Sequence, residues 1–86
     1  MLAQRQRTIE KEIVKIISKK KVINPSRLRV NANLSRDFGF DTADLVDIIL
    51  ELEKSFQIVI PDEVPIHTVG DFVNYVTTQK MAQGQA

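Results

Sequence analysis

Cysteine and tryptophan are absent from the 86-residue chain, and histidine occurs once, at position 67. Without cysteine the protein has no disulfide, no thiolate metal site and no thiol nucleophile of its own. A single histidine has no histidine or cysteine partner for a metal pair, so we expect His67 to be a surface or packing residue. These absences argue against an enzyme and against a resident metal ion.

Long apolar runs and phosphate-binding glycine loops are missing as well. No apolar stretch approaches the about 20 residues that a membrane-spanning helix requires. The first residues, MLAQRQRTIEK, lack the apolar segment of a secretory signal. The three glycines, at positions 39, 70 and 84, do not have the spacing of a nucleotide-binding loop. We therefore expect no membrane insertion and a cytoplasmic location, which a cysteine-free composition also suits.

Charge is distributed unevenly, although the net charge is only +1. Residues 1–36 hold ten lysines and arginines against two glutamates, and residues 37–86 hold nine acidic residues against two lysines. Such asymmetry points to partners: nucleic acid or membrane for the basic part, a basic protein surface for the acidic part. No aromatic residue interleaves with Lys19, Lys20 and Lys21, as stacking on single-stranded nucleic acid requires. We therefore favour a solvated helix end there, and no nucleic-acid partner.

Apolar residues recur at helical spacing in three segments. We predict helices over residues 8–21, 42–56 and 68 to about 78. Their apolar stripes are formed by Ile9, Ile13, Ile16 and Ile17, by Leu45, Ile48, Ile49, Leu52 and Phe56, and by Val69, Phe72, Val73 and Val76. These stripes predict an all-α fold, a small antiparallel four-helix bundle with three main helices and one short one.

The helix ends and connections are less regular. Thr8, Thr68 and either Asp41 or Thr42 are candidate N-caps, with Glu10 and Glu12 expected in the first turn of the first helix. The long connection 22–40 is expected to be pinned across the core by its apolar residues, with a helical turn near Pro25. Residues 57–60 form either a loop or a short strand. We expect a single domain over 1–86, with a core of about 8–78 and a frayed polar tail at 79–86.

The residues before the second helix, Asp37 to Asp44, read DFGFDTAD. Acyl carrier proteins have an attachment motif there: acid, apolar, Gly, small or apolar, Asp, Ser, Leu, Asp or Glu. IPDE at 60–63 and TVGD at 68–71 follow at a similar spacing. On these motifs the chain resembles the acyl carrier protein family over about residues 8–78, and the resemblance implies a helical bundle of the acyl-carrier type.

The resemblance also implies a function and a cofactor. A family member carries acyl or related thioester intermediates on a 4'-phosphopantetheine arm in fatty-acid, lipid or polyketide-type synthesis, and it is not an enzyme. Thr42 occupies the attachment position, with Gly39 and Asp41 as neighbouring cofactor-binding residues. The physical reason is that a phosphodiester at a helix N-terminus meets unpaired N–H groups and the positive end of the helix dipole. A glycine before it allows a tight turn.

The acidic face of the second helix is the implied docking surface. Asp44, Asp47 and Glu51 would meet basic patches on a phosphopantetheinyl transferase and on acyl-handling synthases or transferases. Such rim charges suit brief, salt-sensitive contacts by a monomeric shuttle. Asp41, Asp44 and Asp47 are spaced as a solvated stripe rather than as a calcium loop, and we expect no metal.

Three positions depart from the family motif. Threonine replaces serine at 42, Ala43 replaces the usual leucine, and Phe40 is bulky where a small residue is frequent. The β-branch makes the hydroxyl of Thr42 more hindered and stiffer, so slower modification is expected. Two alternatives stay open: Thr42 is only an N-cap, or the chain is a carrier-like interaction module that lacks the arm.

Overall fold

The computed structural model describes residues 2–61 and 63–84. Within them the chain forms α1 (Leu2–Lys21), the 3-10 turn η1 (Pro25–Arg27), α2 (Leu34–Phe38), α3 (Thr42–Phe56) and α4 (Val69–Gly84). The described residues form no strand beyond an isolated bridge between Asn33 and Thr68. The predicted helical bundle, with three long helices and one short one, is confirmed.

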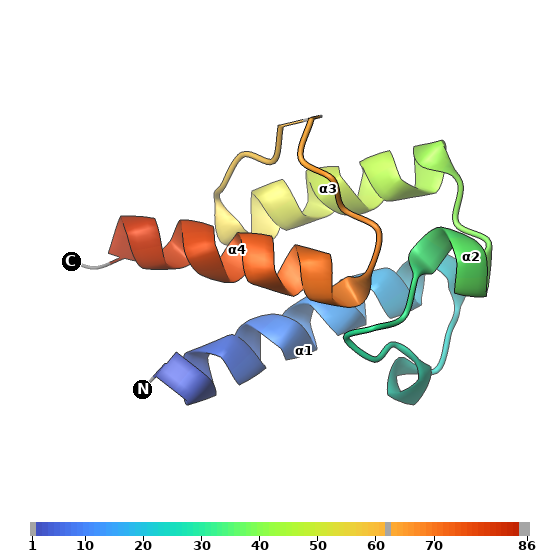
Figure 1. Cartoon of the computed structure of the whole chain (residues 1–86), viewed down its shortest axis with the longest axis horizontal. Coiled ribbons are helices and arrows are strands. Elements are labelled where there is room, and N and C mark those ends of the chain that lie inside the picture. The colour runs from blue at the N-terminus through green and yellow to red at the C-terminus, as the bar shows by residue number, and fades with distance from the viewer. Residues whose placement is uncertain (1, 62, 85–86) are drawn as a thin grey trace.

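The three long helices are not all antiparallel to one another. Figure 1 shows α1 running opposite to both α3 and α4, while α3 and α4 run in the same direction. Residues 63–68 lead back toward the end of the molecule at which α3 starts, so that α4 runs in the same direction as α3. No helix among the described residues has the length and apolar character needed to cross a membrane.

The predicted stripes form the core. Ile13, Ile17, Ile48, Leu52, Val69, Phe72 and Val76 are at most 1% exposed, and Ile9 and Val73 are also buried. α1 contacts both α3 and α4, so it lies at the centre of the packing. Helices of this length are marginal alone in water, and the buried faces therefore supply most of their stability.

The start of α1 differs from the prediction. The helix begins at Leu2, so Thr8 lies inside it and is not an N-cap, and Glu10 and Glu12 are not in its first turn. The residues before Thr8 are mostly good helix formers, with no proline or glycine to stop the helix. They lack an apolar stripe, and for this reason the periodicity did not reveal them.

The end of α4 also differs. The helix continues to Gly84, so the expectation of a frayed tail is wrong for residues 79–84, while 85–86 lie outside the described residues. Gln, Lys, Met and Ala in this stretch favour a helix. Lys80 Nζ donates to the carbonyl of Phe56 at 3.2 Å and ties the last turns of α4 to the end of α3.

Residues 57–60 form a loop rather than the rival strand. Gln57 ends α3 in the left-handed conformation, with a φ of 54°. Glu53 Oε2 then accepts from the N–H of Ile60 at 2.8 Å, and Tyr75 donates its hydroxyl to the carbonyl of Val59 at 3.1 Å. Side chains of α3 and α4 thus satisfy backbone groups that a neighbouring strand would otherwise pair.

The long connection 22–40 is ordered by contacts with the start of α4. Its helical turn near Pro25 is confirmed as η1, and it also contains α2, the short helix of the bundle, whose position the periodicity did not reveal. The N–H groups of Val69 and Gly70 donate to carbonyls of Ala32 and Val30 at 3.1 and 2.8 Å. Leu28 and Leu34 are buried as expected, whereas Val22 and Val30 are 93% and 50% exposed.

Candidate functional site

The turn before α3 is fixed by one glycine and one buried ring. Gly39 ends α2 with a φ of 71°, the left-handed region that favours glycine. The next residue, Phe40, is only 3% exposed, and its N–H donates to the carbonyl of Leu34 at 3.1 Å. The chain therefore turns sharply, is anchored in the core, and starts α3 at the surface with Thr42 (Figure 1).

Asp41, and not Thr42, is the N-cap of α3. Its Oδ1 accepts from the N–H of Asp44 at 2.9 Å, and Asp44 Oδ2 accepts from the N–H of Asp41 at 3.2 Å. Thr42 is the first residue within the helix, it is exposed, and its hydroxyl forms no hydrogen bond with the described residues. The interpretation of Thr42 as a simple cap is therefore wrong.

Two cationic groups of α1 approach the acidic face of α3. Lys21 Nζ lies 3.2 Å from Asp44 Oδ2 and 5.5 Å from the centroid of the Phe40 ring. The N–H of Asp41, and then the Lys21 ammonium, hold the pKa of Asp44 below its usual value. The carboxylate of Asp44 is thus already ion-paired within the chain, and the ammonium of Lys21 lies beside the start of α3.

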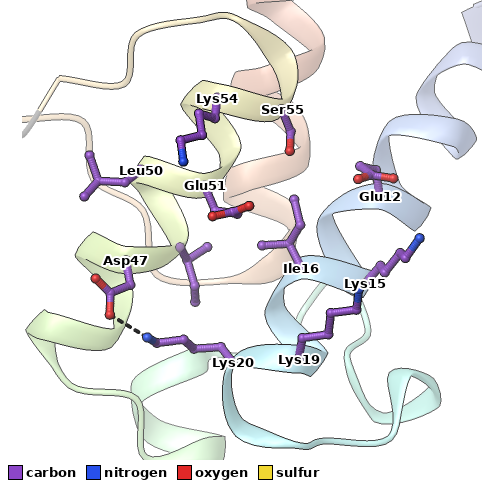
Figure 2. A pocket seen from close by; sticks show the side chains of 11 residues that line it. Glu12, Lys15, Ile16, Lys19, Lys20, Asp47, Leu50, Glu51, Lys54 and Ser55 are labelled. Atoms are coloured by element: carbon purple, nitrogen blue, oxygen red, sulfur yellow. Dashed lines mark hydrogen bonds and ion pairs between the residues drawn. The ribbon is translucent and has the colours of Figure 1, made fainter.

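Asp47 is paired in the same way, one turn further along α3. Lys20 Nζ donates to Asp47 Oδ2, and this hydrogen bond raises the pKa of Lys20 (Figure 2). Glu51 is exposed and has no ion-pair partner among the described residues. The structure therefore brings the three predicted docking carboxylates onto one helix but neutralises two of them within the chain.

A hollow of about 620 Å³ separates α1 from α3 at this point. Lys15, Lys19 and Lys20 line it from α1, and Asp47 and Glu51 line it from α3. In Figure 2 the side chain of Lys20 reaches across to Asp47, whereas those of Lys15 and Lys19 point away from α3. The partly buried Ile16 and the buried Ile48 also line it. Part of the charge asymmetry between residues 1–36 and residues 37–86 is therefore balanced by an ion pair within the molecule.

Two exposed apolar side chains on α3 belong to the candidate docking surface and were not predicted. Val46 and Leu50 are 46% and 54% exposed, and they flank Asp47 along the helix. Leu50 points away from α1 in Figure 2. Docking surfaces commonly combine an apolar centre with a polar rim. The sequence feature that could have revealed them is their spacing of four residues, which places both on one face of the helix, outside the buried stripe.

His67 and the aspartates of α3 give no sign of a metal centre. The described residues contain no cluster of three His, Asp or Glu side chains arranged to hold an ion. His67 is exposed, and its backbone N–H donates to Asp71 Oδ2 at 2.7 Å. Burial raises the pKa of Asp71, but hydrogen bonds from the N–H groups of His67 and Thr68 lower it overall.

Comparisons with known proteins agree with this geometry. The family model described as "Phosphopantetheine attachment site" matches residues 11–76. The acyl carrier protein of Amoebophilus asiaticus is 40% identical over 70 residues, covering 79% of this chain and 88% of the relative. The acyl carrier protein of Wolinella succinogenes is 35% identical over 71 residues, covering 80% of this chain and 93% of the relative. That of Prochlorococcus marinus is 32% identical over 77 residues, covering 87% of this chain and 96% of the relative.

The chain belongs to the acyl carrier protein family. It is a carrier of acyl thioesters, and its prosthetic group is 4'-phosphopantetheine. Members of this family are carriers rather than catalysts. The resemblance inferred from DFGFDTAD, IPDE and TVGD is thereby confirmed.

The start of α3 in this acyl carrier protein fits a phosphate group. The first N–H groups of a helix lack intrahelical acceptors, and Asp41 satisfies only that of Asp44. The N–H groups of Thr42 and Ala43 remain at the positive end of the helix dipole, where an anion is favoured. The bulky Phe40 does not crowd this position because its ring is buried in the core.

Proposed function

We propose that Thr42 bears the 4'-phosphopantetheine arm through its side-chain oxygen. The observation that carries the proposal is the exposed Thr42 hydroxyl, free of hydrogen bonds to the described residues and directly after the N-cap. The arm supplies the thiol that holds the acyl group, which the cysteine-free chain itself lacks. Gly39 provides the turn, and Asp41 frees the threonine side chain by capping the helix in its place.

The experiment is incubation of the apo-protein with coenzyme A and a broad-specificity phosphopantetheinyl transferase, read by intact mass. Attachment adds about 340 Da as a covalent group. We expect slow, partial conversion of the parent, because the methyl group on Cβ hinders the hydroxyl and restricts χ1. Thr42→Ser should convert several-fold faster, and Thr42→Ala should gain no mass.

Two results would refute the assignment of Thr42. One is a Thr42→Ser protein that stays wholly unmodified while a serine-bearing carrier in the same reaction is converted. The other is a mass gain by Thr42→Ala. A chain that carries no arm when purified from its native host would favour the alternative of a carrier-like interaction module.

We propose that the carrier docks on its enzymes through α3. The partners would be the phosphopantetheinyl transferase and acyl-handling synthases or transferases with basic patches, and the carrier would not be a catalyst itself. Asp44, Asp47 and Glu51 would meet these patches, and the exposed Val46 and Leu50 support an interface on the same helix. The proposal includes a monomeric carrier in the cytoplasm, in keeping with the cysteine-free composition.

Glu51 provides the cleanest test of this docking face, because Asp44 and Asp47 already form ion pairs with lysines of α1. Glu51→Lys is expected to slow association with the transferase and to reduce its salt dependence, since rim charges act mainly on these two quantities. Surface plasmon resonance at several salt concentrations measures both. Glu10→Lys, on a part of α1 that lines a different hollow, is the matched control. Equal association rates for Glu51→Lys and the parent at low salt would remove this surface from the proposal.

A further inference from the structure

Three arginines of this carrier lie around a hollow whose lining includes no residue of α3. Arg27, Arg29 and Arg36 line a hollow of about 520 Å³ formed by η1, the connection after it and α2. Among the described residues, Arg36 alone of the three has a carboxylate partner, Asp37, with Nε and Oδ1 3.2 Å apart. Asp44 and Asp47 are instead paired with lysines of α1.

Local contacts hold this arginine surface in shape. The guanidinium of Arg27 lies 5.4 Å from the centroid of the Phe38 ring, within the range of a cation–π contact. Asp37 also accepts from the N–H of Asn33 at 2.9 Å, a bond that lowers the pKa of Asp37 and keeps it ionised. Arg36 remains 74% exposed beside it. Three guanidinium groups therefore face solvent around a single carboxylate, that of Asp37, which is already bonded to Arg36 and to the backbone of Asn33.

The position of the arginine surface determines which molecules will meet it. Its lining includes Phe38, the last residue of α2, and the chain then passes through Gly39 to Thr42. Figure 1 shows η1 and α2 at the same end of the bundle as the start of α3. An enzyme that acts on an arm attached at Thr42 has to approach this end of the molecule.

We propose that Arg27, Arg29 and Arg36 form a second docking surface, which binds a carboxylate-rich patch on an enzyme that handles the arm. This inference rests on the proposed attachment at Thr42. Arginine suits the role because its planar guanidinium binds carboxylates in bidentate geometry. A partner with a basic patch for α3 and an acidic patch for the arginines can bind in one orientation only, since reversal sets like charges against each other.

The test uses purified enzymes of the organism that encodes the chain: its phosphopantetheinyl transferase and an acyl-handling synthase. For at least one of them, Arg29→Glu is expected to associate roughly ten-fold more slowly at low salt, within the range of electrostatic steering. Its salt response should also be flatter. Lys11→Glu is the matched control, an exposed charge reversal on α1 that does not line this hollow. Circular dichroism of each variant checks the fold. Unchanged association of Arg29→Glu with both enzymes would overturn the inference.

Two further measurements distinguish an enzyme-docking surface from a nucleic-acid or membrane site, and from an error in the attachment position. Arg29→Glu is also combined with Thr42→Ala, and it should slow enzyme association in that background too. A wrong attachment site would then appear as a mass gain by Thr42→Ala, and a wrong docking surface as unchanged association of Arg29→Glu. A labelled 20-nucleotide single-stranded RNA and phosphatidylglycerol vesicles are tested with the same variants. If RNA or vesicle binding is lost in Arg29→Glu while enzyme association is unchanged, the surface serves nucleic acid or membrane, and the inference is overturned.

Discussion

Replacing Leu52 with alanine is expected to lower the melting midpoint by more than about 10 °C, given that 1 kcal/mol shifts a domain of this size by roughly 4–8 °C. Leu52 has no exposed surface and lies in the middle of the α3 stripe, within the core shared by the three long helices. Truncating a buried leucine typically costs about 2–5 kcal/mol, because it removes apolar burial and leaves a cavity. The free energy of unfolding of a natural protein is only about 5–15 kcal/mol, so this loss is a large fraction of the total stability.

Circular dichroism melts of Leu52→Ala and Asp47→Ala measure the contrast on a single helix. Asp47 forms an exposed ion pair with Lys20, and such pairs contribute little to stability because water and salt screen them. We expect Asp47→Ala to melt within a few degrees of the parent. If Leu52→Ala instead melts like the parent while Asp47→Ala collapses, the helix is turned the wrong way and its core and docking faces must be exchanged.

The helix that carries the site was the most predictable part of the fold. Its bounds, Thr42 and Phe56, agree with the sequence prediction because a capping residue, a regular stripe and a clear end coincide there. α2 was not predictable from periodicity, since a helix of five residues contains little more than one turn. Its order comes from tertiary contacts, such as the bond from the N–H of Leu34 to the carbonyl of His67 at 3.0 Å.

At the candidate site, the motif yields a prediction for the attachment position, but it gives no information about the surrounding electrostatics. Gly39 and Asp41 have local roles, a turn and a cap, that follow from neighbouring residues in the chain. Lys20 and Asp47 are 27 positions apart, and nothing local indicates that α1 and α3 bring them together. From the sequence alone the charge asymmetry indicates only partners, whereas the structure balances part of it by ion pairs within the chain.

This internal pairing changes what a docking enzyme meets. A basic patch that approaches α3 has to compete with Lys20 and Lys21 for Asp47 and Asp44. Of the three predicted docking carboxylates, Glu51 is the one that forms no ion pair with the described residues. Exposed pairs of this kind are weak and screened by salt, so the competition is feasible. It also explains why Glu51 is the position we expect to respond most directly to charge reversal.

Replacing Gly70 with alanine is expected to destabilise the carrier by about 1–3 kcal/mol, the usual cost of forcing extra volume into a packed site. The N–H of Gly70 donates to the carbonyl of Val30 at 2.8 Å. A Cβ at position 70 would lie only 2.8 Å from that same oxygen, and backbone cannot move aside as a flexible side chain can. The glycine of TVGD is thus required by the close approach of the long connection to α4.

The sign of this prediction is informative because helix propensity acts in the opposite direction. Alanine favours a helix over glycine by about 1 kcal/mol, and Gly70 lies in the first turn of α4. Asn74→Ala, at an exposed position on the same helix, gains propensity without a clash and should melt at or slightly above the parent temperature. We expect Gly70→Ala to melt roughly 5–20 °C lower, which follows from 4–8 °C per kcal/mol. A Gly70→Ala protein that melts as high as Asn74→Ala would mean that residues 30–34 do not pack against the start of α4 in solution.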